Sequence, residues 1–321
     1  MFSRAVRPPA AWRRATASGA GRVERQATAL EHLVEVVSLL VLLGHGAGCS
    51  QTIVAACRRV AREPEREVPL TGGNMNTVVR VGDTVRRTAG PWTPTIHALL
   101  RHIRAAGFTL APEPLGIDGR GREILTFLPG VAGAYPLPAV RYSDATLDAV
   151  AAMLRAYHDA TAGFVVPHGG VWQFPDHQPV EVICHNDVAP YNLIFDGDAL
   201  TGIIDWDLAS PGPRVWDVAY SAYRFVPLSA PANRDIPFPG EDEQTRRLAR
   251  LCAVYDHPAI RPRPVLDTAI ARLHDLNAFM HREASAGNAA QQAIIDRGRG
   301  DMYALDAAYL EEAAARLAPA G

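Results

Sequence analysis

The most constraining part of this chain is residues 181–220, EVICHNDVAPYNLIFDGDALTGIIDWDLASPGPRVWDVAY. Short apolar runs alternate there with polar turns, a pattern that predicts three short strands between residues 181 and 204. Asp187, Asn192 and Asp205 fall at the ends of these strands. Because paired strands lie about 5 Å apart, we expect the three side chains to converge on one point.

Oxygen-bearing side chains in this arrangement indicate a metal site. Mg²⁺ prefers hard oxygen ligands and commonly takes only one or two from protein side chains, leaving its other positions to water and nucleotide phosphates. The amide of Asn192 and the carboxylate of Asp205 meet that requirement. With a base nearby, these residues predict a magnesium-phosphate site.

The charge composition excludes several kinds of chemistry. The chain has 32 basic residues that are all arginine, because the sequence contains no lysine. Schiff-base catalysis and a Walker loop ending in Gly-Lys are therefore impossible. Residues 67–321 carry 22 arginines against 29 acidic residues. An acidic body argues against nucleic acid as a partner, since phosphate binding draws on clustered positive charge.

Residues 1–66 differ from the rest of the chain, with 10 arginines against 5 glutamates. The apolar run at residues 36–43 is too short for a membrane span, which needs about 20 residues. We expect a poorly ordered or helical extension, with helices near 29–43 and 50–62, and no stable membrane insertion. A membrane-tethered or transcription-linked fusion is the alternative. Four widely spaced cysteines support neither a disulfide framework nor a zinc site, so the reduced cytoplasm is the expected location.

The body begins with a pattern of strands. Residues 68–89 read as strand, glycine turn, strand, Gly-Asp turn and strand. A helix with apolar residues at helical spacing follows at 94–106, and further strands are expected at 115–117 and 123–127. A Pro- and Gly-rich linker starts after Leu128.

The remainder is mainly helical. The predicted helices are 143–161, 214–226, 241–256, 265–286 and 289–317. The pattern therefore predicts an α+β chain with three parts: the extension 1–66, a small antiparallel-sheet lobe at 67–128 and a helical lobe at 129–321.

Three motifs, in order, resemble those of the aminoglycoside phosphotransferase family. They are HNDVAPYN at 185–192, IIDWD at 203–207 and the downstream Asp217, and the resemblance covers about residues 68–318. This family, which also includes choline, homoserine and sugar kinases, has a protein-kinase-like two-lobe fold. The resemblance implies binding of ATP and Mg²⁺.

The resemblance also implies roles for residues of the two motifs. Asp187 would act as the catalytic base toward an acceptor hydroxyl, while Asn192 and Asp205 would hold Mg²⁺. His185 would brace the catalytic loop, and Asp217 would hydrogen bond to the backbone of that loop. Two interpretations of Asp207 remain open: it makes a second contact to the metal or the acceptor, or it has a structural role.

Nucleotide contacts are expected in the first lobe. The turn TGGNMN resembles the family's nucleotide-covering loop, with Gly72, Gly73 and Asn76 near the phosphates. Such folds place a cation on the third strand, and strand alternation favours Arg87 over Arg86 for this role.

Two further features complete the expected nucleotide site. Phe127 and Leu128 begin a segment that resembles the adenine hinge. The family pattern also has an acid on the first helix to pair with the cation. The segment 92–106 contains no Asp or Glu, and His97 stands near the expected place.

We therefore expect an ATP-dependent phosphotransferase that moves the γ-phosphoryl group to a hydroxyl of a small molecule. The alternative is a catalytically inactive, nucleotide-binding kinase-like module. An acidic acceptor wall for aminoglycosides could be built from Asp235, Glu241, Asp242 and Glu243, but a solvated helix start explains the same residues.

Overall fold

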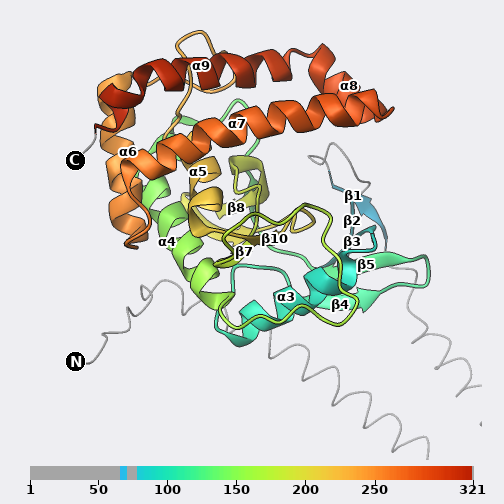
Figure 1. Cartoon of the computed structure of the whole chain (residues 1–321). Helices are drawn as coiled ribbons and strands as arrows, with labels where there is room; N and C mark the ends of the chain where they lie inside the picture. The colour runs from blue at the N-terminus through green and yellow to red at the C-terminus, as the bar shows by residue number, and fades with distance from the viewer. Residues whose placement is uncertain (1–65, 71–77, 320–321) are drawn as a thin grey trace, which may run out of the picture. The chain divides into compact units, whose positions relative to one another are not determined.

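The computed structural model describes residues 66–70 and 78–319. The predicted glycine turn and the predicted N-terminal helices lie outside these ranges. Within them, a small sheet lies at one end and a larger helical part at the other (Figure 1). This is the kinase-like arrangement that the sequence predicted, and the exact domain boundaries given above stay predictions.

The first sheet has five strands, in the order β1-β2-β3-β5-β4, with every neighbouring pair antiparallel. Valine, isoleucine and threonine are common in it, as the pleated surface favours. The Gly82-Asp83 turn joins two of the strands as predicted. The strands are β1 (Val68–Pro69), β2 (Val79–Val81), β3 (Thr84–Thr88), β4 (Pro114–Ile117) and β5 (Arg122–Thr126).

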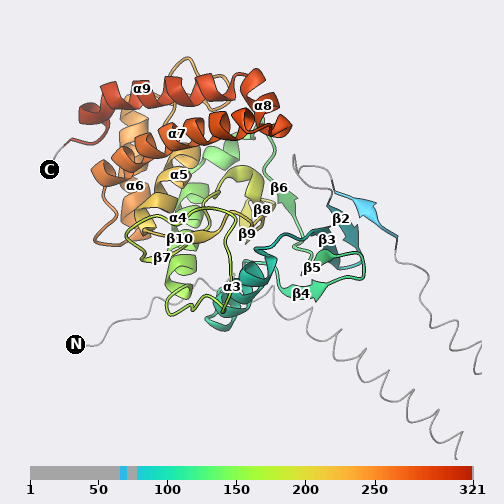
Figure 2. The same cartoon turned by 45° about the vertical axis from the view of Figure 1, so that its right-hand side comes forward.

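Helix α3 (Thr93–Ala105) lies between this sheet and the helical part (Figure 2). Proline in its first turn suits a helix start, since the missing N–H would have no partner there. Its buried apolar residues recur at helical spacing and contribute to the core; they are Ile96, Leu99, Leu100 and Ile103.

The connection between the two parts contains a short strand that sequence analysis missed. Within the predicted linker, β6 (Val131–Ala132) pairs with β8 (Leu193–Asp196), and the 3-10 turn η2 (Ala139–Tyr142) follows. Gly133 donates its N–H to the carbonyl of Pro190 at 3.0 Å. A Cβ atom at Gly133 would lie 2.5 Å from that carbonyl oxygen. The connection therefore needs glycine to pack against the segment that leads into β8.

Two strand pairs frame the loop predicted to carry the chemistry. β7 (Val182–Cys184) pairs with β10 (Ser210–Gly212), and β8 pairs with β9 (Ala199–Ile203). β7, β8 and β9 confirm the three predicted strands. The sequence Ser-Pro-Gly of β10 gave no strand signal, because its pairing depends on β7 rather than on its own propensity.

The helices form the rest of the structure, and α7 lies beside α5 and α9 in both views (Figures 1 and 2). One prediction was wrong: the expected helix 289–317 is two helices. Gly298 has φ 77°, a left-handed conformation that ends the first of them. The helices are α4 (Asp144–Ala160), α5 (Arg214–Phe225), α6 (Glu241–Tyr255), α7 (Pro262–Ser285), α8 (Ala289–Asp296) and α9 (Arg299–Leu317).

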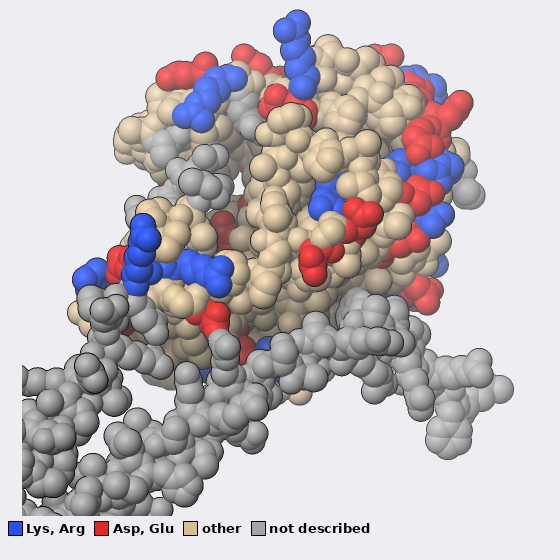
Figure 3. Space-filling view, turned by 180° about the vertical axis from the view of Figure 1, so that it is seen from behind, with Lys and Arg blue, Asp and Glu red and all other residues tan. Residues whose placement is uncertain are grey.

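One continuous apolar core runs from α3 through the strands around the loop to α9. Among the described helices, none combines the length and apolar character that a membrane crossing requires. Acidic and basic residues lie close together on the face seen in Figure 3. Ion pairs link α6 to α4, from Arg246 to Asp144 at 2.8 Å and from Arg250 to Asp148 at 2.7 Å.

Candidate active site

Asp187 lies in the loop between β7 and β8, and neighbouring side chains fix its carboxylate. One oxygen accepts a hydrogen bond from the hydroxyl of Tyr191 at 2.7 Å, and the other accepts one from Nδ2 of Asn192 at 2.9 Å. Burial raises the pKa of Asp187, while the hydrogen bond from Tyr191 opposes that rise. The loop thus fixes the orientation of the Asp187 carboxylate, and burial increases its affinity for a proton.

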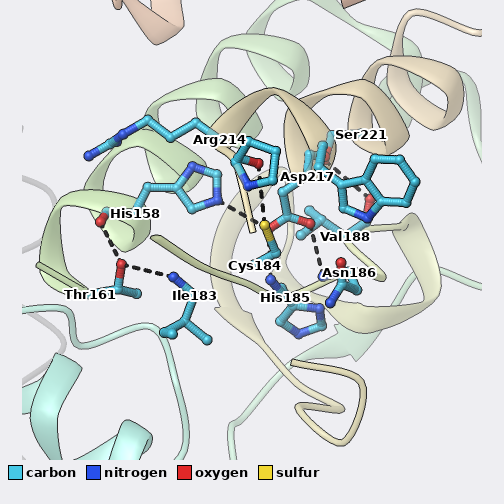
Figure 4. Close-up of polar contacts among 12 residues, drawn as sticks. His158, Thr161, Ile183, Cys184, His185, Asn186, Val188, Arg214, Asp217 and Ser221 are labelled. Carbon is cyan, nitrogen blue, oxygen red and sulfur yellow. Dashed lines mark hydrogen bonds and ion pairs between the residues drawn. The ribbon is translucent and has the colours of Figure 1, made fainter. Parts of the chain in front are cut away.

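The backbone of this loop is held by Asp217 on α5 (Figure 4). Its two oxygens accept the backbone N–H groups of His185 and Asn186 at 2.7 and 2.9 Å, as the resemblance implied. His158 on α4 donates a third hydrogen bond from Nε2 at 3.1 Å. Burial alone would raise the pKa of Asp217, but the bond from His158 and nearby positive charge keep that pKa below its usual value.

His185 joins the loop to the strand that carries the second motif. Its Nε2 donates to the carbonyl of Ile204 at 3.1 Å, and its Nδ1 accepts the backbone N–H of Asp187 at 3.3 Å. Burial lowers the pKa of His185, which favours the neutral ring that these two contacts require. The expected bracing role of His185 has this structural basis.

Asn192 and Asp205 leave the same end of the β8–β9 hairpin. Leu193 pairs with Ile203, and the N–H of Ile204 donates to the carbonyl of Asn192 at 2.9 Å. The hairpin register therefore brings together the two residues that the sequence singled out.

The side-chain oxygens of these two residues suit a hard cation. Nδ2 of Asn192 donates to both the carbonyl and the carboxylate of Asp187, so the amide oxygen is left as an acceptor. Asp205 has a left-handed backbone, φ 65°, and a side chain that is 51% exposed. Strained conformations of this kind cluster at functional sites. Among the described residues, no group of three or more His, Cys, Asp and Glu side chains forms a metal cluster. Two oxygens and nucleotide phosphates fit Mg²⁺ better than a cage made only of protein.

Arg87 on β3 reaches the same end of the hairpin. Its Nη1 lies 2.9 Å from Asp205, and its Nη2 lies 2.6 Å from Asp207. Its Nε donates to Glu123 on β5. Burial would lower the pKa of Arg87, but the carboxylates of Asp207, Glu123 and Asp205 outweigh burial and raise it.

Glu123 is the acidic partner of Arg87 that the sequence did not predict. We expected such a partner on the first helix, where the sequence has no acid. The partner comes from a strand, because the sheet register places Glu123 directly opposite Arg87. His97 contacts Glu123 Oε2 at 3.0 Å and forms no hydrogen bond with Arg87. A cross-strand register cannot be read from a single segment, and the sequence gave no other signal for Glu123. Of the two readings left open for Asp207, the contact with Arg87 supports the structural one.

The remaining predicted nucleotide contacts divide into two groups. Gly72, Gly73 and Asn76 lie outside the described residues. Phe127 and Leu128 follow β5, where the hinge was expected. Phe127 donates its N–H to the carbonyl of Asp83 at 2.9 Å, whereas the N–H of Leu128 forms no hydrogen bond within the described residues. Of these two N–H groups, only that of Leu128 has no acceptor among the described residues.

The five-stranded antiparallel sheet followed by a mostly helical part is the kinase-like fold. Two solved structures share this fold at low sequence identity. A candidate aminoglycoside phosphotransferase from Ralstonia eutropha JMP134 is 13% identical, with a TM-score of 0.54, and the match covers 78% of this chain and 94% of that one. An amicoumacin kinase in complex with AMP-PNP and Ca²⁺ is 12% identical, with a TM-score of 0.53 and coverage of 76% and 93%.

Sequence comparison narrows the class to a family. Residues 169–250 match the phosphotransferase enzyme family. The trifolitoxin immunity protein of Rhizobium leguminosarum bv. trifolii is 40% identical over 151 residues, which are 45% of this chain and 56% of that protein. The chain thus spans about half the length of this curated relative. Residues 169–250 therefore match the phosphotransferase family that the three motifs resemble, which confirms the predicted resemblance over this part of the chain.

Proposed function

We propose that the protein is an ATP-dependent phosphotransferase whose acceptor is a hydroxyl of a small molecule. The contact of Arg87 with Asp205 carries this proposal, since it joins the strand predicted to hold phosphates to the loop predicted to hold the metal. Asp187 lies beside Asn192 in the same loop. A base, two oxygen ligands and a cation are thus gathered around one place.

In this proposal, Asp187 orients the acceptor hydroxyl and accepts its proton as the new O–P bond forms. The bond between the γ-phosphorus and the bridging oxygen of ADP breaks at the same time. Mg²⁺, held by Asn192 and Asp205, would supply neutralisation of phosphate charge. Arg87 would bind the α- and β-phosphates through its planar fork of N–H donors.

The other nucleotide contacts in this proposal come from the edges of the site. Leu128 and Phe127 would bind adenine through backbone groups, and Gly72, Gly73 and Asn76 would cover the phosphates. The AMP-PNP and Ca²⁺ bound by the amicoumacin kinase support a nucleotide with a divalent cation.

The ion pair at this place bears equally on the proposal and on its alternative, a nucleotide-binding module without transfer, because both require phosphates to bind there. Asp205 is already paired with Arg87, and Asp207 also contacts that arginine. Phosphates and metal must therefore separate an existing ion pair before they bind.

The Rhizobium relative adds a candidate biological role, which is immunity to a toxin. Phosphorylation of a toxin hydroxyl would unite this role with the proposed chemistry. Expression of the chain in a trifolitoxin-sensitive strain tests the role, and unchanged sensitivity would count against it.

The direct test is consumption of ATP with Mg²⁺ in the presence of aminoglycosides, amino alcohols, sugars and hydroxy acids. We expect one acceptor class to raise ADP formation above the rate without acceptor and to yield a phosphorylated product by mass spectrometry. Asp187→Asn should remove this increase. Nucleotide binding without product for any acceptor would favour the binding module instead.

A further inference from the structure

Arg224 on α5 is a buried cation without a carboxylate partner among the described residues. Only 2% of the surface of Arg224 is exposed to solvent. Its Nη2 donates to the hydroxyl of Tyr220 at 2.9 Å and more weakly to that of Tyr303 at 3.4 Å, and its Nε lies 3.3 Å from the Tyr220 hydroxyl. Nη1 makes no hydrogen bond to the described residues. We call Arg224, Tyr191, Tyr220 and Tyr303 the arginine-tyrosine cluster.

The other buried arginines have different partners. Arg87 contacts three carboxylates, and Arg247 pairs with Asp144 and with the carbonyl of Phe225. Arg272 donates to two backbone carbonyls. A buried charge is costly unless it is paired or fully hydrogen bonded. Arg224, like Arg272, contacts no carboxylate among the described residues. It differs from Arg272 in that its acceptors are phenol hydroxyls rather than backbone carbonyls.

The phenols around Arg224 do not neutralise its charge. Burial raises the pKa of Tyr191 and of Tyr220, so both hydroxyls keep their protons at neutral pH. The rings of Tyr191 and Tyr220 lie 5.8 and 5.2 Å from Cζ of Arg224, a range in which cation-π attraction stabilises the guanidinium in part. The net positive charge remains.

The carboxylate of Asp306 on α9 is occupied by other hydrogen bonds. Asp306 accepts hydrogen bonds from the hydroxyl of Tyr223, from Nδ2 of Asn233 and from the N–H of Ala230. Three donors satisfy this carboxylate, and it makes no ion pair with Arg224. The cluster therefore keeps an excess of donors beside a cation that no carboxylate of the described residues contacts directly. The carboxylates of Asp187 and Asp306 are close enough for the charge of Arg224 to lower their pKa.

The cluster is connected to the proposed base. Three consecutive hydrogen bonds run from Asp187 to Tyr191 at 2.7 Å, from Tyr191 to Tyr220 at 3.1 Å and from Tyr220 to Arg224 at 2.9 Å. A small molecule whose hydroxyl lies at Asp187 is therefore close enough for another of its groups to reach the cluster.

Two of the four acidic residues that suggested a polycationic acceptor are paired with arginines. Glu241 pairs with Arg316 at 2.8 Å, and Glu243 pairs with Arg246 at 2.7 Å. Both acids belong to the first turn of α6, as the solvated helix start predicts. Their charge is compensated on the surface.

We propose that Arg224 binds a carboxylate of the acceptor, and that the acceptors of this protein are small hydroxy acids. This proposal rests on the proposed phosphotransferase function. The guanidinium pairs with the carboxylate through Nη1 and through the N–H group of Nη2 that makes only the long 3.4 Å contact with Tyr303, because a guanidinium fork matches the two oxygens of a carboxylate. The hydroxyl at the other end of the acceptor lies at Asp187.

The test compares matched acceptors with the full chain, ATP and Mg²⁺. The acceptors are L-serine, L-homoserine and 5-hydroxypentanoate, each beside its primary amide, which keeps the size and removes the charge. We expect kcat/KM for at least one acid to exceed that for its amide by about 10- to 100-fold, the worth of charge-assisted hydrogen bonds. Arg224→Gln should abolish this preference, and Arg224→Lys should keep part of it.

Arg247→Gln is the matched control. It also removes a buried arginine, and it releases the carbonyl of Phe225 on the same helix, α5. If loosening of α5 explained the effect, Arg247→Gln would change the ratio of acid to amide as well. We expect that ratio to stay as in the wild type.

Thermal shift with the same acids and amides, without ATP, gives a readout that does not depend on turnover. Stabilisation by an acid that is absent for its amide and absent in Arg224→Gln supports the carboxylate site even where no phosphate is transferred. Equal use of acid and amide, or turnover of cationic or neutral acceptors alone, overturns the proposal and leaves the phosphotransferase function standing. If no acceptor yields a product and no acid stabilises the protein more than its amide does, both the carboxylate site and the phosphotransferase function are wrong.

Discussion

Arg87 and Glu123 stand opposite each other on the adjacent antiparallel strands β3 and β5, and their side chains form a buried ion pair. His97 on α3 contacts the second oxygen of the same glutamate at 3.0 Å. The helix therefore supplies an imidazole, while the sheet supplies the acid that orients the arginine. This arrangement fixes the guanidinium by strand register rather than by the position of the helix.

Removing Arg87 should weaken nucleotide binding strongly. We expect Arg87→Ala to raise the ATP dissociation constant by about 10- to 100-fold, since charge-assisted hydrogen bonds to phosphate are lost. Glu123→Gln should cause a smaller rise, because it leaves the cation in place but loosens its orientation. ATP titrations followed by calorimetry measure both effects.

Arg86 supplies the control for this series. Its Nη1 donates to Thr84, and it has no contact with Glu123 or Asp205, so Arg86→Ala should leave ATP affinity nearly unchanged. His97→Ala should have an intermediate effect, because His97 acts on the arginine only through Glu123. A larger loss at Arg86 than at Arg87 would contradict the assignment.

Much of the fold and of the candidate site follows from local sequence. The helical spacing of Ile96, Leu99 and Ile103 in α3 needed only neighbouring residues. The same holds for the motif that contains Asp187 and Asn192. Glu123 was missed because its partner is 36 residues away and depends on a strand register. Arg224 was missed for a related reason, since tyrosines from the loop, α5 and α9 meet around it only in the folded chain. Such contacts depend on tertiary packing that no short segment encodes.

Tyr191 should tune the pH dependence of turnover. Burial raises the pKa of Asp187, and the Tyr191 hydrogen bond limits that rise, so Tyr191→Phe should raise this pKa further. A base must be deprotonated to act, and activity falls as pH drops through its pKa. The acid limb of the kcat/KM profile should therefore move to higher pH in the mutant. An unmoved limb would show that another group controls it.

The raised pKa of Asp187 also affects stability. The native state binds its proton more tightly than the unfolded state, so this residue contributes less stability as pH rises. Asp187→Asn should therefore gain stability relative to the wild type at neutral pH and lose that advantage in acid. Urea unfolding at several pH values measures the difference.

Asp205 should govern the metal dependence of nucleotide binding. In Asp205→Ala, a metal ligand is lost, so Mg²⁺ should no longer increase ATP affinity. Without Mg²⁺, affinity should equal or exceed that of the wild type, because Arg87 is released from one of its three carboxylates. Titrations of both proteins with and without Mg²⁺ separate the two effects. A metal dependence that survives in the mutant would assign the ligand elsewhere.

Replacing Asp217 should lower the stability of the folded protein. Asp217→Asn places an amide where a carboxylate accepts from His185, Asn186 and His158, so at least one buried donor loses its acceptor. We expect a cost of about 1–3 kcal/mol in the free energy of unfolding. Asp159→Asn, which alters exposed ion pairs with Arg155 and Arg214, should cost less than about 1 kcal/mol.

The pH dependence of unfolding gives a second measurement of how Asp217 stabilises the catalytic loop. Because the folded-state pKa of Asp217 is lowered, its charge stabilises the protein above its unfolded-state pKa, and that contribution disappears as pH falls through the folded-state value. Asp217→Asn has no carboxylate to protonate at this position. Its unfolding free energy should therefore decline less steeply below about pH 4 than that of the wild type. Parallel acid unfolding curves for the two proteins would mean that His185 and Asn186 are held by the surrounding packing, and that the charge of Asp217 contributes little to the catalytic loop.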